Sequence, residues 1–323
     1  YFEEMIHRFR EGMTQRLWDQ WCAIGVRGVS EKSREVNWIV DPEALLLAST
    51  RLFSFEPRLR DVATDWVIRN GSQMSLARLK SIRKNRGFSN ETELRDLVET
   101  VREIEPDLKQ WKSIAFPGGD KVVQELTYNY RRSSTSPDPN SAAGTIFNFR
   151  GLFGVNSRAE ILLWLILERS AHPALIAEQT GWFTKTVQKT LNEMALSGHI
   201  TYSQIGRIKH FSTTPEIWKP FVDYEKTWWV SQPQLYDGCF AVLDSLEECS
   251  GKLPSERVAE IWMGQAIEKA ISNFEKSNDL DYVVAGKRGK VQEDLRNIIE
   301  WIESEKDWPI LSLESKLLQR KYR

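Results

Sequence analysis

One short stretch of the chain concentrates side chains that can hydrogen-bond to the edges of DNA bases. Glutamine and asparagine amides match the donor and acceptor groups of adenine, and lysine matches guanine or a phosphate oxygen. If the stretch is helical, its apolar residues Val187 and Leu191 fall on the opposite face. The polar and basic residues are Thr184, Lys185, Gln188, Lys189 and Asn192.

The elements that must position these side chains follow from the spacing of the apolar residues around them. Helical spacing predicts three helices, separated by a turn at Gly181 between the second and the third. Between residues 157 and 218 the pattern is a helix, a short helix, a turn, a longer helix and two strands. This is the order of a winged helix-turn-helix. The apolar residues are Ile161, Leu162, Leu165 and Ile166, then Leu175 and Ile176, then Val187, Leu191 and Met194.

Alternation of residue types after Ile200 predicts two short antiparallel strands joined near Gly206. Arg207 and Lys209 lie at the tip of this hairpin, and such residues neutralise phosphate or enter a narrow minor groove. The alternative is a solvated turn with incidental charge. His210 is expected to be a strand residue, and it could face His199 across the hairpin.

Residues 174–181 (ALIAEQTG), 186–191 (TVQKTL) and 197–200 (SGHI) resemble bacterial winged-helix regulators of the arsenical-resistance-repressor and MarR-like kind. The resemblance covers about a fifth of the chain. It implies that Ala177 packs where two helices cross and that Gly181 takes the turn. Val187 and Leu191 would hold the recognition helix, so that readout in the major groove falls to its polar face.

The chain departs from this family where a small capping serine is usual, because Trp182 and Phe183 stand there. An aromatic side chain cannot cap a helix, so Thr184 is predicted to be the N-cap. The two rings either stack against nucleic acid or add to the core of a neighbouring domain, and burial is the more common role of large aromatics.

Charge and composition narrow the class of protein. Residues 150–222 hold eight Lys or Arg against five Glu, a net charge of +3, whereas the whole chain has a net charge of −1. A chain so near neutrality is not a general nucleic-acid coat. We expect a cytoplasmic protein, since no apolar run is long enough to span a membrane and no signal segment opens the chain.

The sequence contains no recognisable motif for catalysis or for cofactor binding. Cys22, Cys239 and Cys249 are scattered, and the four histidines are unclustered, so neither a disulfide framework nor a metal site is predicted. The glycine and lysine stretch at 286–290 lacks the spacing of a phosphate-binding loop. We therefore expect no cofactor and no enzymatic activity, although a triad assembled in space leaves no trace in one sequence.

The predicted fold is mainly α, with a central winged helix-turn-helix flanked by helical domains. The boundaries are an N-terminal helical domain at 1–116, a linker at 117–149, the DNA-binding domain at 150–222 and a C-terminal helical domain at 223–323. Predicted flanking helices include one that begins at Pro42 after the cap Asp41 and one over 224–230. A basic run from Arg78 to Arg86 is a secondary candidate for DNA contact, and an ordinary exposed basic face is the alternative.

Two main hypotheses follow. In the first, the chain is a transcriptional regulator that binds specific sequences of double-stranded DNA, as a homodimer held by flanking helices and tryptophans. In the second, the winged helix is a protein-interaction module in a larger assembly. A third and minor alternative is an enzyme, and no effector is indicated.

Overall fold

The computed structural model describes residues 1–27, 36–116, 133–278 and 290–304. These residues are mainly helical, as predicted, with one small three-stranded antiparallel sheet. The chain forms two compact units, one of Leu17–Trp229 and one that joins Tyr1–Arg16 to Val230–Arg323. None of the helices in the described ranges is both long enough and apolar enough to cross a bilayer. The domain boundaries predicted above stay predictions.

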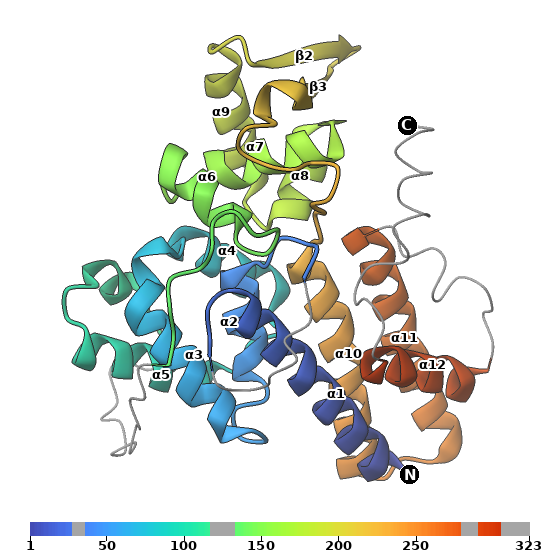
Figure 1. Cartoon of the computed structure of the whole chain (residues 1–323). Coiled ribbons are helices and arrows are strands. Elements are labelled where there is room, and N and C mark those ends of the chain that lie inside the picture. Colours follow the sequence, from blue (N-terminus) through green and yellow to red (C-terminus); the bar gives the residue numbers. More distant parts are fainter. Residues whose placement is uncertain (28–35, 117–132, 279–289, 305–323) are drawn as a thin grey trace. The chain divides into compact units, whose positions relative to one another are not determined.

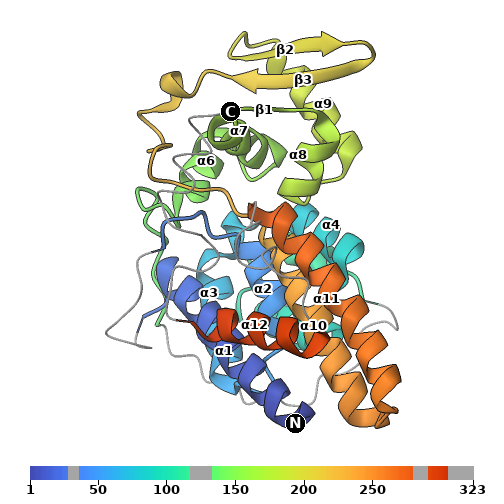
Figure 2. The ribbon, with the colours of Figure 1, turned by 90° about the vertical axis from the view of Figure 1, so that its right-hand side faces the viewer.

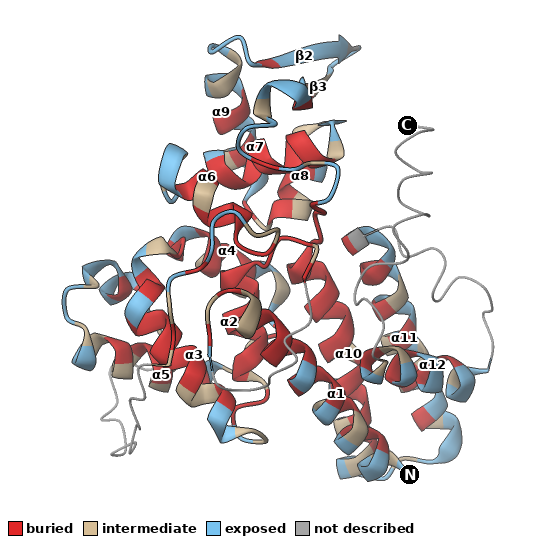
Figure 3. Cartoon of the chain, viewed as in Figure 1, coloured by how far each residue is buried: buried red, intermediate tan, exposed pale blue. Residues whose placement is uncertain are grey.

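The first part of the larger unit is a group of helices around a buried central one (Figure 1). Every residue of the central helix, α2, is buried, as its colour in Figure 3 shows. Its start is the predicted one, because the Asp41 side chain accepts a hydrogen bond from the Ala44 N–H at 3.0 Å and Pro42 opens the first turn. The elements are α2 (Pro42–Thr50), α3 (Pro57–Asn70), η1 (Gly71–Gln73), α4 (Leu76–Arg86), α5 (Glu91–Ile104) and η2 (Lys109–Ser113).

The second part of the larger unit contains further helices and the sheet. The apolar run of α7 is buried along its whole length and forms the core here. The elements are α6 (Thr145–Phe153), α7 (Ser157–Glu168), β1 (Ser170–Ala171), α8 (Pro173–Thr180), α9 (Thr184–Ala195), β2 (Ile200–Ile205), β3 (Ile208–Thr213) and η3 (Pro215–Trp218). The strand order is β1-β3-β2, and both pairings are antiparallel.

The predicted hairpin is present and turns at Gly206, which has the left-handed φ of 62°. Its register corrects one expectation. His210 pairs with Ser203, whereas His199 precedes β2, so the two histidines do not face each other. The His199 ring instead contacts Trp218, and the His210 ring contacts His172.

The smaller unit is a helical group (Figure 2). Gly238 of α10 lets α11 come close, because a Cβ there would lie 2.8 Å from the Phe274 ring. Arg16 donates from Nε to the carbonyl oxygen of Ile302 at 3.0 Å and joins α1 to α12. The helices are the first part of α1 (Phe2–Ala23), α10 (Gln232–Lys252), α11 (Glu256–Asn278) and α12 (Val291–Glu303).

One predicted helix is wrong. Residues 224–230 form turns and extended chain rather than a helix. Trp228 pairs in parallel with Trp38, and its backbone exchanges hydrogen bonds with Asn37 and Ile39. This long-range pairing outweighs the local helical pattern. The predicted linker, 117–149, is non-helical over 133–144, but its last residues, 145–149, belong to α6. Its first residues, 117–132, lie outside the described ranges, as do residues 286–289.

Candidate functional site

The turn between α8 and α9 has the predicted form. α8 ends at Gly181, whose φ of 73° is left-handed, and the Gly181 N–H bonds to the Ala177 carbonyl oxygen. Ile176 and Ala177 are buried, so α8 presents apolar side chains to the core. Glycine at such a position ends a helix without steric cost and allows the chain to reverse into the next one.

Helix α9 separates a buried face from an exposed one. Val187, Thr190 and Leu191 are buried, and Thr190 is hydrogen-bonded to Ser157 of α7 at 2.8 Å. All the predicted polar residues of this helix lie on the exposed side and are open to solvent: Thr184, Lys185, Gln188, Lys189 and Asn192. The arrangement leaves a row of donors and acceptors free for a ligand.

One carboxylate shares this exposed face. Glu193 lies 3.8 Å from the Lys189 Nζ, and it forms a closer ion pair with Arg158 at 2.6 Å. Since Arg158 already partners Glu193, the Lys189 charge is only partly offset. Exposed pairs of this kind contribute little to stability, so Lys189 can leave Glu193 for another anion at small cost.

The start of α9 corrects the predicted cap. Phe183, with extended φ and ψ, occupies the N-cap position without a side-chain hydrogen bond, and Thr184 is already helical. The prediction that Thr184 caps the helix is therefore wrong. Trp182 is buried and donates from Nε1 to Glu160 at 3.2 Å, as expected for a core aromatic. Phe183 is 41% exposed, and the Lys84 Nζ lies 6.0 Å from its ring centroid.

The two basic residues of the hairpin differ in their surroundings. Arg207 is exposed beside the turn glycine. Lys209 is half-buried, and its Nζ lies 4.2 Å above the Tyr202 ring centroid, a cation–π contact. Both views of the larger unit show α9 and the hairpin at the same end (Figures 1 and 2). The structure thus places the two elements that carry the predicted residues at one end of the larger unit.

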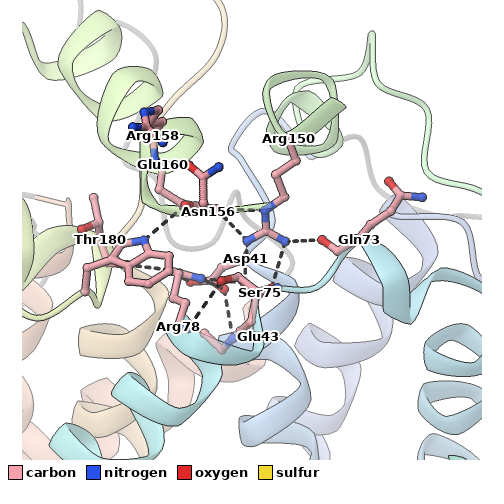
Figure 4. Close-up of polar contacts among 12 residues, drawn as sticks. Asp41, Glu43, Gln73, Ser75, Arg78, Arg150, Asn156, Arg158, Glu160 and Thr180 are labelled. Atoms are coloured by element: carbon pink, nitrogen blue, oxygen red, sulfur yellow. Dashed lines mark hydrogen bonds and ion pairs between the residues drawn. The ribbon is translucent and has the colours of Figure 1, made fainter. Parts of the chain in front are cut away.

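A buried cluster of charges lies behind the turn (Figure 4). The Arg78 Nη1 donates to Asp41 at 2.6 Å and to Glu43 at 2.8 Å, and its Nη2 forms an ion pair with Asp41. Arg150 lies 2.7 Å from Glu43 and 2.7 Å from Glu160. These five side chains are almost inaccessible to solvent. Glu43 therefore bridges two guanidinium groups that come from α4 and α6.

The cluster holds the α8–α9 turn from both sides. The Arg78 Nε donates to the carbonyl oxygen of Thr180 at 2.6 Å, and Glu160 accepts from the Trp182 indole. Thr180 and Trp182 flank Gly181, the residue at which the chain reverses. Charge-assisted bonds in a buried site are stronger than neutral ones, so they fix the turn relative to α2 and α4.

The charges also set the ionisation of the cluster. Burial raises the pKa of Asp41, but the Arg78 charge and hydrogen bond outweigh it and hold that pKa below its ordinary value. Burial lowers the pKa of Arg78, and Asp41 and Glu43 reverse the effect, so its net pKa is raised. The pKa of Arg150 is raised in the same way by Glu43 and Glu160. These shifts favour the charged forms of Asp41, Arg78 and Arg150.

Sequence reasoning missed this cluster. Arg78, the first residue of the basic run at 78–86, is not on an exposed face, because it is buried; Arg83 is bound to Glu91, whereas Lys84 is exposed. The secondary prediction is therefore wrong for Arg78. The available signal was Glu43, a charged residue in the otherwise apolar stretch ALLLA of its helix. A carboxylate in a buried helix requires a buried cationic partner, but the sequence does not say which one.

A separate cavity of about 670 Å³ opens in the larger unit, between the start of α6 and residues 219–227. Its walls include Lys219, Lys226 and Asp223, and no histidine or cysteine is among its lining residues. Lys226 and Asp223 are exposed and lie 3.5 Å apart. The hydroxyls of Ser141 and Thr145 in its lining donate to the backbone carbonyl oxygens of Asp138 and Ser141 rather than to a base, so the face of α9 and the hairpin is the stronger candidate site.

No protein-family model, curated protein or solved structure matches this chain.

Proposed function

We propose that residues 150–222 form a winged helix-turn-helix and that the protein binds double-stranded DNA in a sequence-specific manner, as a transcriptional regulator. The observation that carries the proposal is the exposed polar face of α9. Its five predicted residues are accessible, while Val187 and Leu191 on the other side are buried. A helix of this kind fits the major groove, where base edges differ in donor and acceptor pattern.

Within this proposal the residues divide into two roles. Gln188, Lys189 and Asn192 on α9 read base edges in the major groove. Arg207 at the hairpin tip contacts the phosphate backbone or the minor groove and fixes the position of the protein. The ion cluster supports both roles, because it holds the turn that sets where α9 begins. No catalytic role and no cofactor are part of the proposal.

A specific observation favours a second candidate, a protein-interaction module. Leu196, directly after α9, is 89% exposed, and Tyr202 and Ile208 of the hairpin are 49% and 55% exposed. Apolar side chains gathered at one end of a unit mark protein interfaces more often than DNA interfaces. We rank this candidate second because the face of α9 itself is polar.

The experiment that tests the proposal is selection of duplexes from a random pool by the full chain at low salt, with competitor DNA. Enrichment of one motif, confirmed in genomic fragments that include the DNA upstream of the protein's own gene, is the expected result. Failure to retain any duplex at low salt would overturn the proposal and favour the interaction module.

Two substitutions test the assignment of readout. Gln188→Ala and Lys189→Ala should each weaken binding to the selected motif by about 1–3 kcal/mol and relax preference at one position, because each loses a base contact. Thr201→Ala serves as a control. Thr201 is an exposed residue of β2, its hydroxyl is hydrogen-bonded to that of Ser212, and the proposal gives it no contact with DNA. Thermal unfolding of each variant should match the parent. Unchanged affinity and specificity in both α9 variants would contradict the assignment.

A further inference from the structure

We propose that the DNA-binding surface continues from α9 onto α4, where Lys84 contacts the phosphate backbone of the same duplex. The inference rests on the function proposed above and adds a contact from the helices that precede the winged helix. The sequence offers the whole basic run from Arg78 to Arg86 as a secondary candidate for DNA contact, and Lys84 is the exposed cation of that run that lies beside Phe183.

The first step is that α4 is fixed relative to α9. Arg78 lies on α4 and donates to the Thr180 carbonyl oxygen at 2.6 Å, while its guanidinium also binds Asp41 and Glu43. Arg78 is 1% exposed, so displacement of α4 from the α8–α9 turn would leave its buried guanidinium without one of its acceptors, the Thr180 carbonyl oxygen. Loss of such an acceptor is costly, and α4 therefore stays beside the α8–α9 turn.

The second step is the position of Lys84 itself. It lies near the end of α4, and its Nζ is 6.0 Å from the centroid of the Phe183 ring. Phe183 is the residue immediately before α9 and is itself partly exposed. The contact with the Phe183 ring thus places the Lys84 ammonium group near the start of α9, the helix that faces DNA in the proposal.

The third step is that Lys84 is available for an anion. Other basic residues of α4 are engaged: Arg83 binds Glu91, and Lys80 donates to Ser113 at 2.9 Å. Lys84 is exposed, and no carboxylate pairs with it among the residues that the structure describes. Its positive charge adds to that of Lys185 in the first turn of α9, so the two raise the local attraction for an anion.

The chemistry selects a backbone phosphate as the partner. A helix in the major groove is flanked by the phosphates of both strands, and a cation beyond the end of that helix meets them rather than a base edge. Lysine binds phosphate as a point charge without demanding one geometry. Lys84 therefore contributes affinity and salt dependence, but no sequence preference.

The test measures affinity of the full chain for its selected duplex, and for a scrambled duplex, at several salt concentrations. Lys84→Ala should weaken binding to both duplexes several-fold and reduce the slope of log affinity against log salt by about 0.9. Lys84→Arg should restore both values, because it keeps the charge. Phe183→Leu removes the ring under the ammonium and should show a smaller loss of the same kind.

The control is Arg58→Ala, which removes one exposed positive charge from α3, a helix remote from α9 in both views. It should leave the salt slope unchanged. If Lys84→Ala binds as the parent does while Lys189→Ala weakens binding, the inference is wrong and the proposed function stands. If the parent chain retains no duplex at low salt, the proposed function fails and the inference fails with it.

Discussion

Arg207 and Lys209 have the same predicted role in the sequence, but their surroundings in the structure differ. Arg207 is exposed, whereas Lys209 lies over Tyr202. If the proposed function holds, Arg207→Ala should weaken binding to all DNA sequences about equally and flatten the salt dependence by about 0.9, since the variant lacks the proposed phosphate contact. Lys209→Ala should have the smaller effect on the salt slope, because Lys209 is half-buried and its ammonium lies only 4.2 Å from the Tyr202 ring centroid, whereas Arg207 is exposed. Filter binding across a salt series measures both.

A change of preferred sequence in Arg207→Ala, at an unchanged salt slope, would contradict the division of roles. The hairpin would then read bases or the shape of the groove.

Asp41 gives a prediction about pH. Its pKa is lowered in the folded protein, so its ionised form is stabilised there relative to the unfolded chain. The stabilisation is present above the unfolded value of about 3.9 and is lost as pH falls through the folded value. We therefore expect the free energy of unfolding to drop as pH is lowered below about 4, measured by urea denaturation at a series of pH values.

Asp41→Asn isolates this contribution. The variant should be less stable at pH 7 by up to about 3–5 kcal/mol, because the buried Arg78 loses one of its two carboxylate partners and keeps only Glu43. Its stability should also vary less with pH between 4 and 2 than that of the parent. An equally steep acid dependence in the variant would assign the effect to other carboxylates.

At the scale of elements, α9 combines a structural face with an exposed one, and the two respond differently to substitution. Leu191 is fully buried. Leu191→Ala should lower the free energy of unfolding by about 2–5 kcal/mol through the cavity that it leaves. Thermal or urea unfolding followed by circular dichroism measures the loss. A cost below about 1 kcal/mol would mean that the site collapses around the smaller side chain.

Predictability from sequence also varies between elements. The hairpin, the turn at Gly181 and the buried and exposed faces of α9 follow from local residue spacing, and the structure has them. Residues 224–230 read locally as a helix, but a backbone pairing with distant residues holds them extended. The start of α9 was missed by one residue, because the backbone at Phe183 takes the N-cap conformation without a capping side chain.

The buried ion cluster could not be predicted from the sequence, because it also depends on contacts between residues that are distant along the chain. Glu43, Arg78 and Arg150 come from three helices, and nothing in their spacing shows that they converge. Local periodicity reports which face of a helix is apolar. It does not report which charged residues from distant helices share a buried site.

At the scale of the whole molecule, the predicted homodimer is open to a direct measurement. Two of the tryptophans that suggested a dimer interface, Trp21 and Trp66, are buried in the core of the larger unit instead, where their ring centroids lie 5.4 Å apart. The remaining reason to expect a dimer is the proposed function, which would place two recognition helices about one turn of DNA apart. We expect light scattering to give a protein mass of two chains, both for the free protein and, after the mass of the DNA is subtracted, for the complex. A protein mass of one chain in both states would exclude the dimer.

The ion cluster has a consequence for how the protein can be divided. Asp41, Glu43 and Arg78 come from the part that precedes residue 116, whereas Arg150 and Glu160 come from the part that follows. A fragment cut to the α6–β3 segment would keep Arg150 and Glu160 but expose them to water, and it would release the Thr180 carbonyl oxygen from Arg78. The α6–β3 segment is therefore not self-contained in this protein, and we expect that grafting it onto another chain would require α2 and α4 to be grafted with it.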